Sequence, residues 1–198
     1  MGDNFDRKVA EQLLIHYRDV TSDIRKMVNE AEEVGRRHNV KLEASAEGIL
    51  TYFDILLQYS LLEIAAADSV YETSEVATIT MITEYGDLIK YLNNMYNANY
   101  TWEDTVNGNG RSLTAFLEET HPFVLQIADK IGELLGVYDK IASSKEYLES
   151  IKDHLLAIII LFKGIDRNDT DEEFEAAKKC IIIEFLASYG LEFKNKNQ

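Results

Sequence analysis

The stretch of sequence that decides the fold runs from Ile49 to Ile64 and reads ILTYFDILLQYSLLEI. If it forms a helix, apolar side chains occupy most of the circumference. A helix that is apolar on most sides is buried on most sides. We therefore predict a central helix that begins after Ser45, whose hydroxyl can cap it, and continues to about Asp68.

The composition of the whole chain favours helix throughout. The 198 residues include ten glycines and one proline, whereas a β-rich protein of this size would need more turn residues. Hydrophobic residues make up 46% of the chain, which is enough to fill a core and excludes global disorder. We predict an all-α fold, in which residues 1–198 form a single helical domain, a bundle of about seven helices.

A long amphipathic N-terminal helix is predicted within residues 1–40, from about Asp6 to His38. Val9, Leu13 and Tyr17 begin an apolar stripe that recurs every three or four residues, and charged residues fill the other face. The helix would be roughly 50 Å long. It must either pack on the bundle or pair with a second copy of the chain as a homodimer, and the sequence leaves both open.

The rest of the helical core, residues 45–190, divides at capping and breaking residues. Pro122 separates two predicted helices because proline fits best in the first turn of a helix. Between helices, residues 97–111 are predicted to form a flexible polar loop. Aromatic residues beside it either form a binding surface or hold the loop on the bundle; they are Tyr91, Tyr96, Tyr100 and Trp102. The predicted helices after the central one are Ser74 to about Asn97, Leu113–Thr120, Pro122–Tyr138, a helix opened by Ser143 and ending at Phe162, and a helix opened by Thr170 and ending near Tyr189.

The charge of the chain bounds its partners. The net charge of −15 at pH 7 would repel nucleic acids and anionic membranes, and it favours basic proteins or divalent cations as partners. The alternative is that the negative charge serves only to keep the protein soluble. The longest apolar run, Leu155 to Phe162, is shorter than the roughly 20 residues of a membrane span. With no targeting segment at the N-terminus, we predict a cytoplasmic protein without a membrane span.

Catalytic motifs are missing from the sequence. There is no nucleophile motif and no glycine-rich phosphate loop, and Cys180 stands in an apolar run typical of a core. No pair of the four histidines has the local spacing of metal ligands. A single E-x-x-H, from Glu118 to His121, is too little for a di-iron site, which needs two such motifs and two further glutamates. We predict that the protein is not an enzyme.

One turn resembles a known family. The central helix ends in Ala65-x-x-Asp68, Tyr71 follows three residues after the aspartate, and Glu75 follows seven after it and opens the next helix. This pattern resembles TerB-like domains, which include tellurite-resistance proteins and the N-terminal domain of a DnaJ-like co-chaperone. Where the family usually has glycine after the aspartate, this chain has Ser69.

The resemblance implies an all-helical domain with a pseudo-repeat that binds divalent cations and joins stress-related complexes. Carried over by position, Asp68 and Glu75 are the candidate metal ligands, for Ca²⁺ or Mg²⁺, which prefer carboxylate oxygens. The ordinary alternative for both residues is helix-end chemistry.

Two functions follow. The first is a non-catalytic acidic interaction domain of the TerB-like kind, which binds divalent cations or a protein partner. The alternative is an acidic inhibitor or immunity-type protein that covers a basic partner such as a nuclease.

Overall fold

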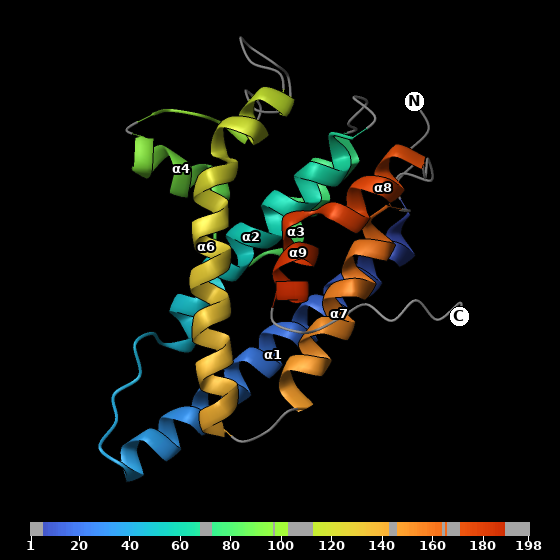
Figure 1. The fold of residues 1–198 in the computed structure, drawn as a ribbon. Coiled ribbons are helices and arrows are strands. Elements are labelled where there is room, and N and C mark those ends of the chain that lie inside the picture. The colour runs from blue at the N-terminus through green and yellow to red at the C-terminus, as the bar shows by residue number, and fades with distance from the viewer. Residues whose placement is uncertain are drawn as a thin grey trace.

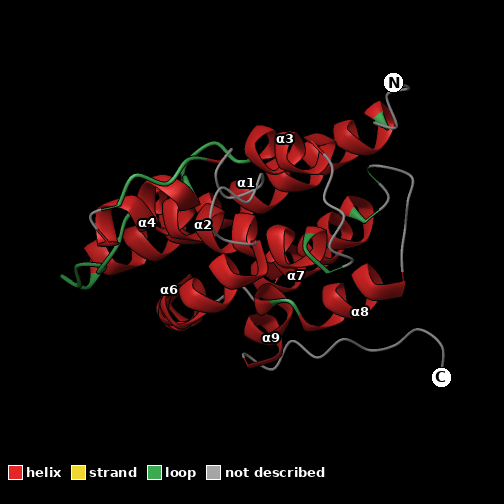
Figure 2. Ribbon diagram, turned by 90° about the horizontal axis from the view of Figure 1, so that it is seen from above, coloured by secondary structure: helices red, strands yellow, loops and turns green. Residues whose placement is uncertain are grey.

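The computed structural model describes residues 6–67, 73–96, 98–102, 113–142, 146–163, 165 and 171–188. Within these ranges all regular secondary structure is helical, which confirms the all-α prediction. Figure 1 shows the bundle, in which α2 lies at the centre, and Figure 2 shows α2 and α7 between α1 and α3 on one side and α6, α8 and α9 on the other. The helices are α1 (Arg7–Arg37), α2 (Ala46–Ala65), α3 (Thr73–Ile82), α4 (Leu88–Tyr96), α6 (Leu113–Ala142), α7 (Glu146–Phe162), α8 (Asp171–Lys179) and α9 (Ile181–Ser188).

The long N-terminal helix is present as predicted. The Asp6 carboxylate accepts hydrogen bonds from the backbone N–H groups of Lys8 and Val9 and so caps α1. The apolar stripe, which includes Leu13 and Tyr17, is buried within the chain's own bundle, chiefly against α7 and α6. Of the two alternatives left open by the sequence, packing on the bundle is therefore found, while a homodimer through the outer face of α1 stays a prediction.

The central helix α2 is buried along most of its length, as its sequence predicts. Phe53, Leu57 and Leu61 are fully buried in a core to which all the neighbouring helices contribute. Among the described residues, α2 is the one helix long and apolar enough to cross a membrane, and 78% of its apolar window is buried within the bundle. Such burial is what the central helix of a bundle shows.

The predicted helix from Ser74 to Asn97 is wrong, because the chain turns between α3 and α4. The turn is held by two polar side chains of α2. The Asp54 carboxylate accepts hydrogen bonds from the N–H groups of Glu84, Tyr85 and Gly86, and Gln58 accepts one from Leu88 N–H. These bonds replace the backbone carbonyls that a continuous helix would offer.

The predicted break at Pro122 is also wrong, since α6 runs through it from Leu113 to Ala142. Pro122 is exposed, and so is Glu118, the residue four positions earlier whose carbonyl loses its helical partner, so water can replace that hydrogen bond. On both sides of the proline, α6 buries apolar residues such as Phe116 and Val124. Burial on both sides of the proline outweighs the loss of one hydrogen bond.

The last predicted helix is two helices, α8 and α9, which meet at Cys180. The N–H groups that open α9 donate to side chains of α2: Ile181 to the Glu63 carboxylate, and Ile182 to the Ser60 hydroxyl. The α2 side chains thus act as a cap supplied by another helix. Cys180 is buried, as predicted, and burial raises the pKa of its thiol to about 12, which suits a core residue.

The described part of the predicted flexible loop, residues 98–102, is tied to α4. The Asn93 side chain donates to the Tyr100 carbonyl and accepts from the Tyr100 N–H at 2.7 and 2.6 Å. Tyr96 and Tyr100 pack edge-on against Phe123 and Phe116 of α6. These aromatic residues therefore hold this part of the loop on the bundle. Asn97 and residues 103–112 lie outside the described residues.

Candidate functional site

A row of polar contacts follows one edge of the interface between α1 and α7. The two helices are antiparallel, since Asp6 N–H at the start of α1 donates to the carbonyl of Ile165 after the end of α7. Along this edge the Ser150 hydroxyl donates to the Asp23 carboxylate at 2.6 Å, and the Tyr147 hydroxyl donates to the Glu30 carboxylate. The row ends in a group of two histidines and one aspartate.

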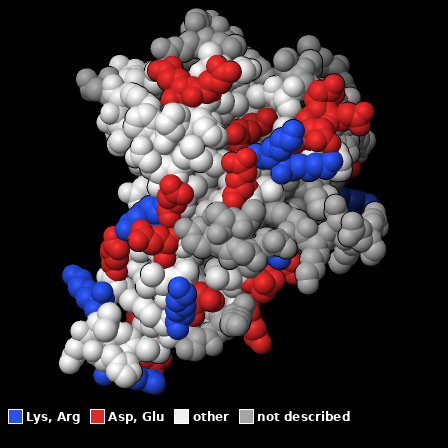
Figure 3. Space-filling model, in the orientation of Figure 1, with Lys and Arg blue, Asp and Glu red and all other residues white. Residues whose placement is uncertain are grey.

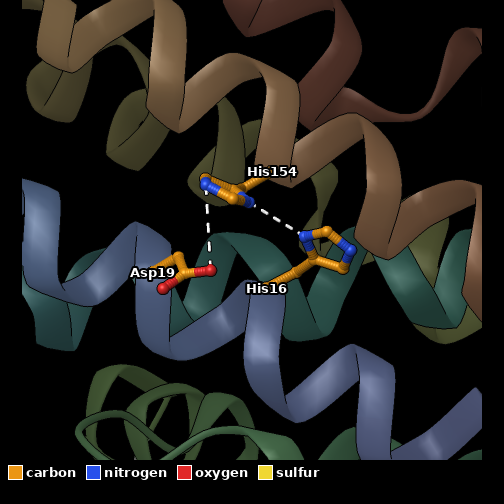
Figure 4. Close-up of side chains that lie close together, drawn as sticks. All are labelled: His16, Asp19 and His154. Carbon is orange, nitrogen blue, oxygen red and sulfur yellow. Dashed lines mark hydrogen bonds and ion pairs between the residues drawn. The ribbon is translucent and has the colours of Figure 1, made fainter.

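That group consists of His16 and Asp19 on α1 and His154 on α7 (Figure 4). The Nδ1 atoms of the two imidazole rings are 2.8 Å apart, and the Nε2 atom of His154 is 3.9 Å from the Asp19 carboxylate. His16 and Asp19 share a face of α1 because they are three residues apart. Both helices bury apolar residues beside the group, so the backbone fixes its position.

The site is open to solvent on one side. The side chains of His154 and Asp19 are 26% and 50% exposed, and His16 is half-buried. An ion or a water molecule can therefore reach the group without movement of the helices. Beside it, His16 also borders a hollow of about 440 Å³ between α1 and α7, whose walls include the exposed side chains of Ile15 and Ile160.

The arrangement of protons limits what the two histidines can do. Two facing Nδ1 atoms at this distance need one proton between them, because two N–H groups would repel and two lone pairs would have no donor. If His154 Nε2–H is directed at Asp19, then His154 Nδ1 accepts and His16 Nδ1–H donates. A change of tautomer in His16 directs both Nδ1 lone pairs at the same point.

These residue types fit a transition-metal ion. Imidazole nitrogens and a carboxylate oxygen are ligands of Zn²⁺ and its neighbours in the first transition row. Two Zn–N bonds of about 2.0–2.1 Å at a tetrahedral angle hold their nitrogens about 3.3 Å apart. The 2.8 Å separation must therefore open by about 0.5 Å, which rotation of partly exposed rings can supply.

Asp19 can serve such an ion in two ways. One potential ligand atom from each of the three residues lies within 4.8 Å of the others, so its carboxylate can complete a three-ligand set. If rotation of the partly exposed side chains closes the 3.9 Å gap, it can instead accept the Nε2–H of His154 and orient that ring, as carboxylates do behind many metal-bound histidines. Either role leaves at least one position for water or a further ligand.

The structure does not place the two metal ligands predicted from the family resemblance, Asp68 and Glu75, in the histidine group. Asp68 lies outside the described residues. Glu75 is in the first turn of α3, as predicted, but it is only 2% exposed. Among the described residues, the single group of three candidate metal ligands is the one at His16, and Glu75 is not part of it. A Ca²⁺ or Mg²⁺ ion at Asp68 and Glu75 stays a prediction.

The histidine pair is a functional candidate that the sequence pattern did not predict. Local spacing reveals no pair of ligands because His16 and His154 are 138 residues apart. The sequence does show that His16 and Asp19 have the i, i+3 spacing of one helical face. That His154 lies opposite them depends on the register of α1 against α7, which the sequence does not show.

Comparisons of the chain with protein-family models, with curated proteins and with solved structures find no match. The resemblance to TerB-like domains therefore stays a prediction, and function has to be inferred from the geometry of the chain itself.

Proposed function

We propose that this protein is a non-catalytic helical binding protein whose ligand is a divalent transition-metal ion, held between α1 and α7 by His16, Asp19 and His154. The observation that carries the proposal is the 2.8 Å approach of two imidazole Nδ1 atoms from residues 138 positions apart, with a carboxylate beside them. Zn²⁺ is the representative ion, because imidazole and carboxylate are among its usual ligands and a catalytic-type site can complete its four ligands with water.

The charge of the chain supports a cation as the ligand. A net charge of −15 raises the local concentration of divalent cations near the surface. Imidazole ligands then select among them, since Ca²⁺ and Mg²⁺ prefer sites built from oxygen. The ion would join α1 to α7 and so tie together segments that are distant in the sequence. This supports the metal-responsive form of the predicted interaction domain.

A calorimetric titration of the full-length, chelator-treated protein with ZnCl₂ tests this function. We expect one saturable site per chain in the wild type, and at least about tenfold weaker binding in His154→Ala and in His16→Ala. His38→Ala is the matched control, because His38 is an exposed histidine at the C-terminal end of α1. Its affinity for zinc should equal that of the wild type.

Two results would overturn the proposal. One is equal zinc affinity in wild type and both histidine variants, which would assign the binding to surface carboxylates. The other is the absence of saturable binding. Parallel titrations with CaCl₂ and MgCl₂ address the other predicted site: saturable binding that is lost in Glu75→Gln but kept in His154→Ala would support Asp68 and Glu75.

The alternative function, an acidic inhibitor that covers a basic partner, is supported by the net charge alone. On the face seen in Figure 3, acidic side chains form separate groups with lysines, arginines and uncharged surface between them. A partner recognised by charge would be expected to meet a continuous acidic surface. The inhibitor function therefore stays a prediction, and the metal site is the proposal.

A further inference from the structure

A second candidate site is a cleft between α2, α6 and α8, away from the histidine pair. Its volume of about 670 Å³ lies within the range of pockets that hold small molecules. Much of its wall is apolar and includes Ala66, Leu117 and Ala176. A few polar side chains face it, and their hydrogen bonds determine which ligand they can accept.

The hydrogen bonds in the cleft leave unused acceptors. Tyr59 uses its single proton to donate to the Leu117 carbonyl at 2.7 Å. The 3.3 Å contact between the Tyr59 oxygen and Nδ1 of His121 therefore makes His121 Nδ1–H the donor. In the neutral ring Nε2 then carries a lone pair, and it has no hydrogen bond to any residue that the structure describes.

Glu63 supplies the second unused acceptor. Its Oε2 atom accepts from Ile181 N–H at 2.9 Å and caps α9, while its Oε1 atom is 3.9 Å from Nδ1 of His121, too far for a hydrogen bond. The Glu63 side chain is 22% exposed, so its charge is only partly solvated. Burial raises the pKa of Glu63 to about 7. The hydrogen bond from Ile181 N–H opposes this shift, and the nearby charge of Glu184 adds to it.

The charges around the cleft favour a cation. Two carboxylates line it, Glu63 and Glu118, against one lysine, Lys179. A ligand that fits must bring hydrogen-bond donors, a positive charge and a short apolar part. We infer that this cleft binds a primary alkylammonium ion, with the ammonium group donating to Glu63 Oε1 and His121 Nε2 and the alkyl chain against Ala66 and Leu117.

The test is an NMR titration of the full-length protein with n-butylammonium chloride at pH 8, where Glu63, with a pKa of about 7, is ionised. A ligand of so few atoms should bind at about millimolar concentration, and the shifted signals should come from residues around the cleft. Sodium butyrate reverses the charge at similar length, and tetramethylammonium chloride keeps the charge but has no N–H donor. We expect saturable binding of butylammonium, no binding of butyrate, and weaker binding of tetramethylammonium.

The variants separate the site from the fold. Glu63→Gln keeps an oxygen to accept from Ile181 N–H, so α9 stays capped while the charge is lost. We expect at least about tenfold weaker butylammonium binding, because a hydrogen bond to a charged group is worth about 1.5–3 kcal/mol. His121→Phe, which keeps the ring but removes Nε2, should also weaken it. Glu47→Gln is the matched control, an exposed glutamate on the same helix.

Equal binding of butylammonium by wild type and Glu63→Gln would overturn the inference, as would equal binding of butyrate, equal binding of tetramethylammonium, or no saturation. His154→Ala should bind butylammonium like the wild type. Failure of the metal site and failure of this cleft would therefore be seen in different variants.

Discussion

The Asp54 carboxylate offers the sharpest test of how the bundle is held together. Asp54 is fully buried, and its Oδ2 atom accepts from the N–H groups of Glu84, Tyr85 and Gly86 at 3.1, 2.6 and 3.0 Å, while the Tyr17 hydroxyl donates to the same carboxylate. In Asp54→Ala, Glu84 N–H keeps a partner because it also donates to the Tyr17 oxygen. Two N–H groups and one hydroxyl lose their acceptor.

The structure sets the size of the loss. A buried donor left without a partner costs about 1–3 kcal/mol, so three would cost about 3–9 kcal/mol. Tyr85 and Gly86 are only half-buried, so water restores part of their bonding. Removal of a desolvated carboxylate offsets more, since burial raises the pKa of Asp54 to about 6 despite its hydrogen bonds. We expect the free energy of unfolding to fall by about 3–5 kcal/mol.

Urea unfolding, monitored by circular dichroism at pH 7, measures this loss. Asp54→Asn is the matched control, because its amide oxygen can still accept from Tyr85 and Gly86. It should cost about 1–2 kcal/mol, clearly less than alanine. If the two variants are equally destabilised, or if Asp54→Ala loses less than about 1 kcal/mol, the Asp54 carboxylate does not hold the α3–α4 turn.

Three further predictions concern single positions. A Cβ at Gly86 would lie 2.2 Å from a backbone carbonyl oxygen of α2, so Gly86→Ala should destabilise the protein by about 3 kcal/mol. A Cβ at Gly48 would make ordinary contacts, so Gly48→Ala should stabilise the protein by about 0.5–1 kcal/mol. Urea unfolding measures both changes. Pro122→Ala restores a helical hydrogen bond and should raise the unfolding free energy by up to about 3 kcal/mol, and a decrease would show that the proline does not strain α6. The pKa of Glu63 is raised from 4.5 to about 7, so between these pH values the folded state binds more protons than the unfolded state, and the free energy of unfolding should fall as pH rises. Glu63→Gln should remove this pH dependence. An unchanged pH dependence in Glu63→Gln would show that Glu63 is not its source.

The all-α class and the long first helix could be predicted because both depend on local pattern. The stripe of Leu13 and Tyr17 recurs at helical spacing wherever the partner helices lie. The breaks could not be predicted in this way. The chain turns at Gly86 and at Cys180 because side chains of α2 accept the N–H groups there, and that contact exists only in the folded bundle.

The candidate sites show the same limit. His16 and Asp19 share a helical face in the sequence, but their partner His154 becomes visible only when α7 lies antiparallel to α1. Glu63 and His121 likewise come from different helices. Hydrogen-bond partners can be assigned to atoms only after this packing is known, and those assignments are what select a metal ion for one site and a donor cation for the other.

The antiparallel pairing of α1 with α7 has a consequence for how the protein forms during translation. The residues that meet at His16 and His154 are 138 positions apart, which at ordinary rates of synthesis means a delay of roughly 7–28 s. During this delay the apolar stripe of α1 leaves the ribosome before its main partner exists. The nascent chain must keep that stripe from aggregating. Cooperative folding of the bundle can begin only when the last third of the chain has been synthesised.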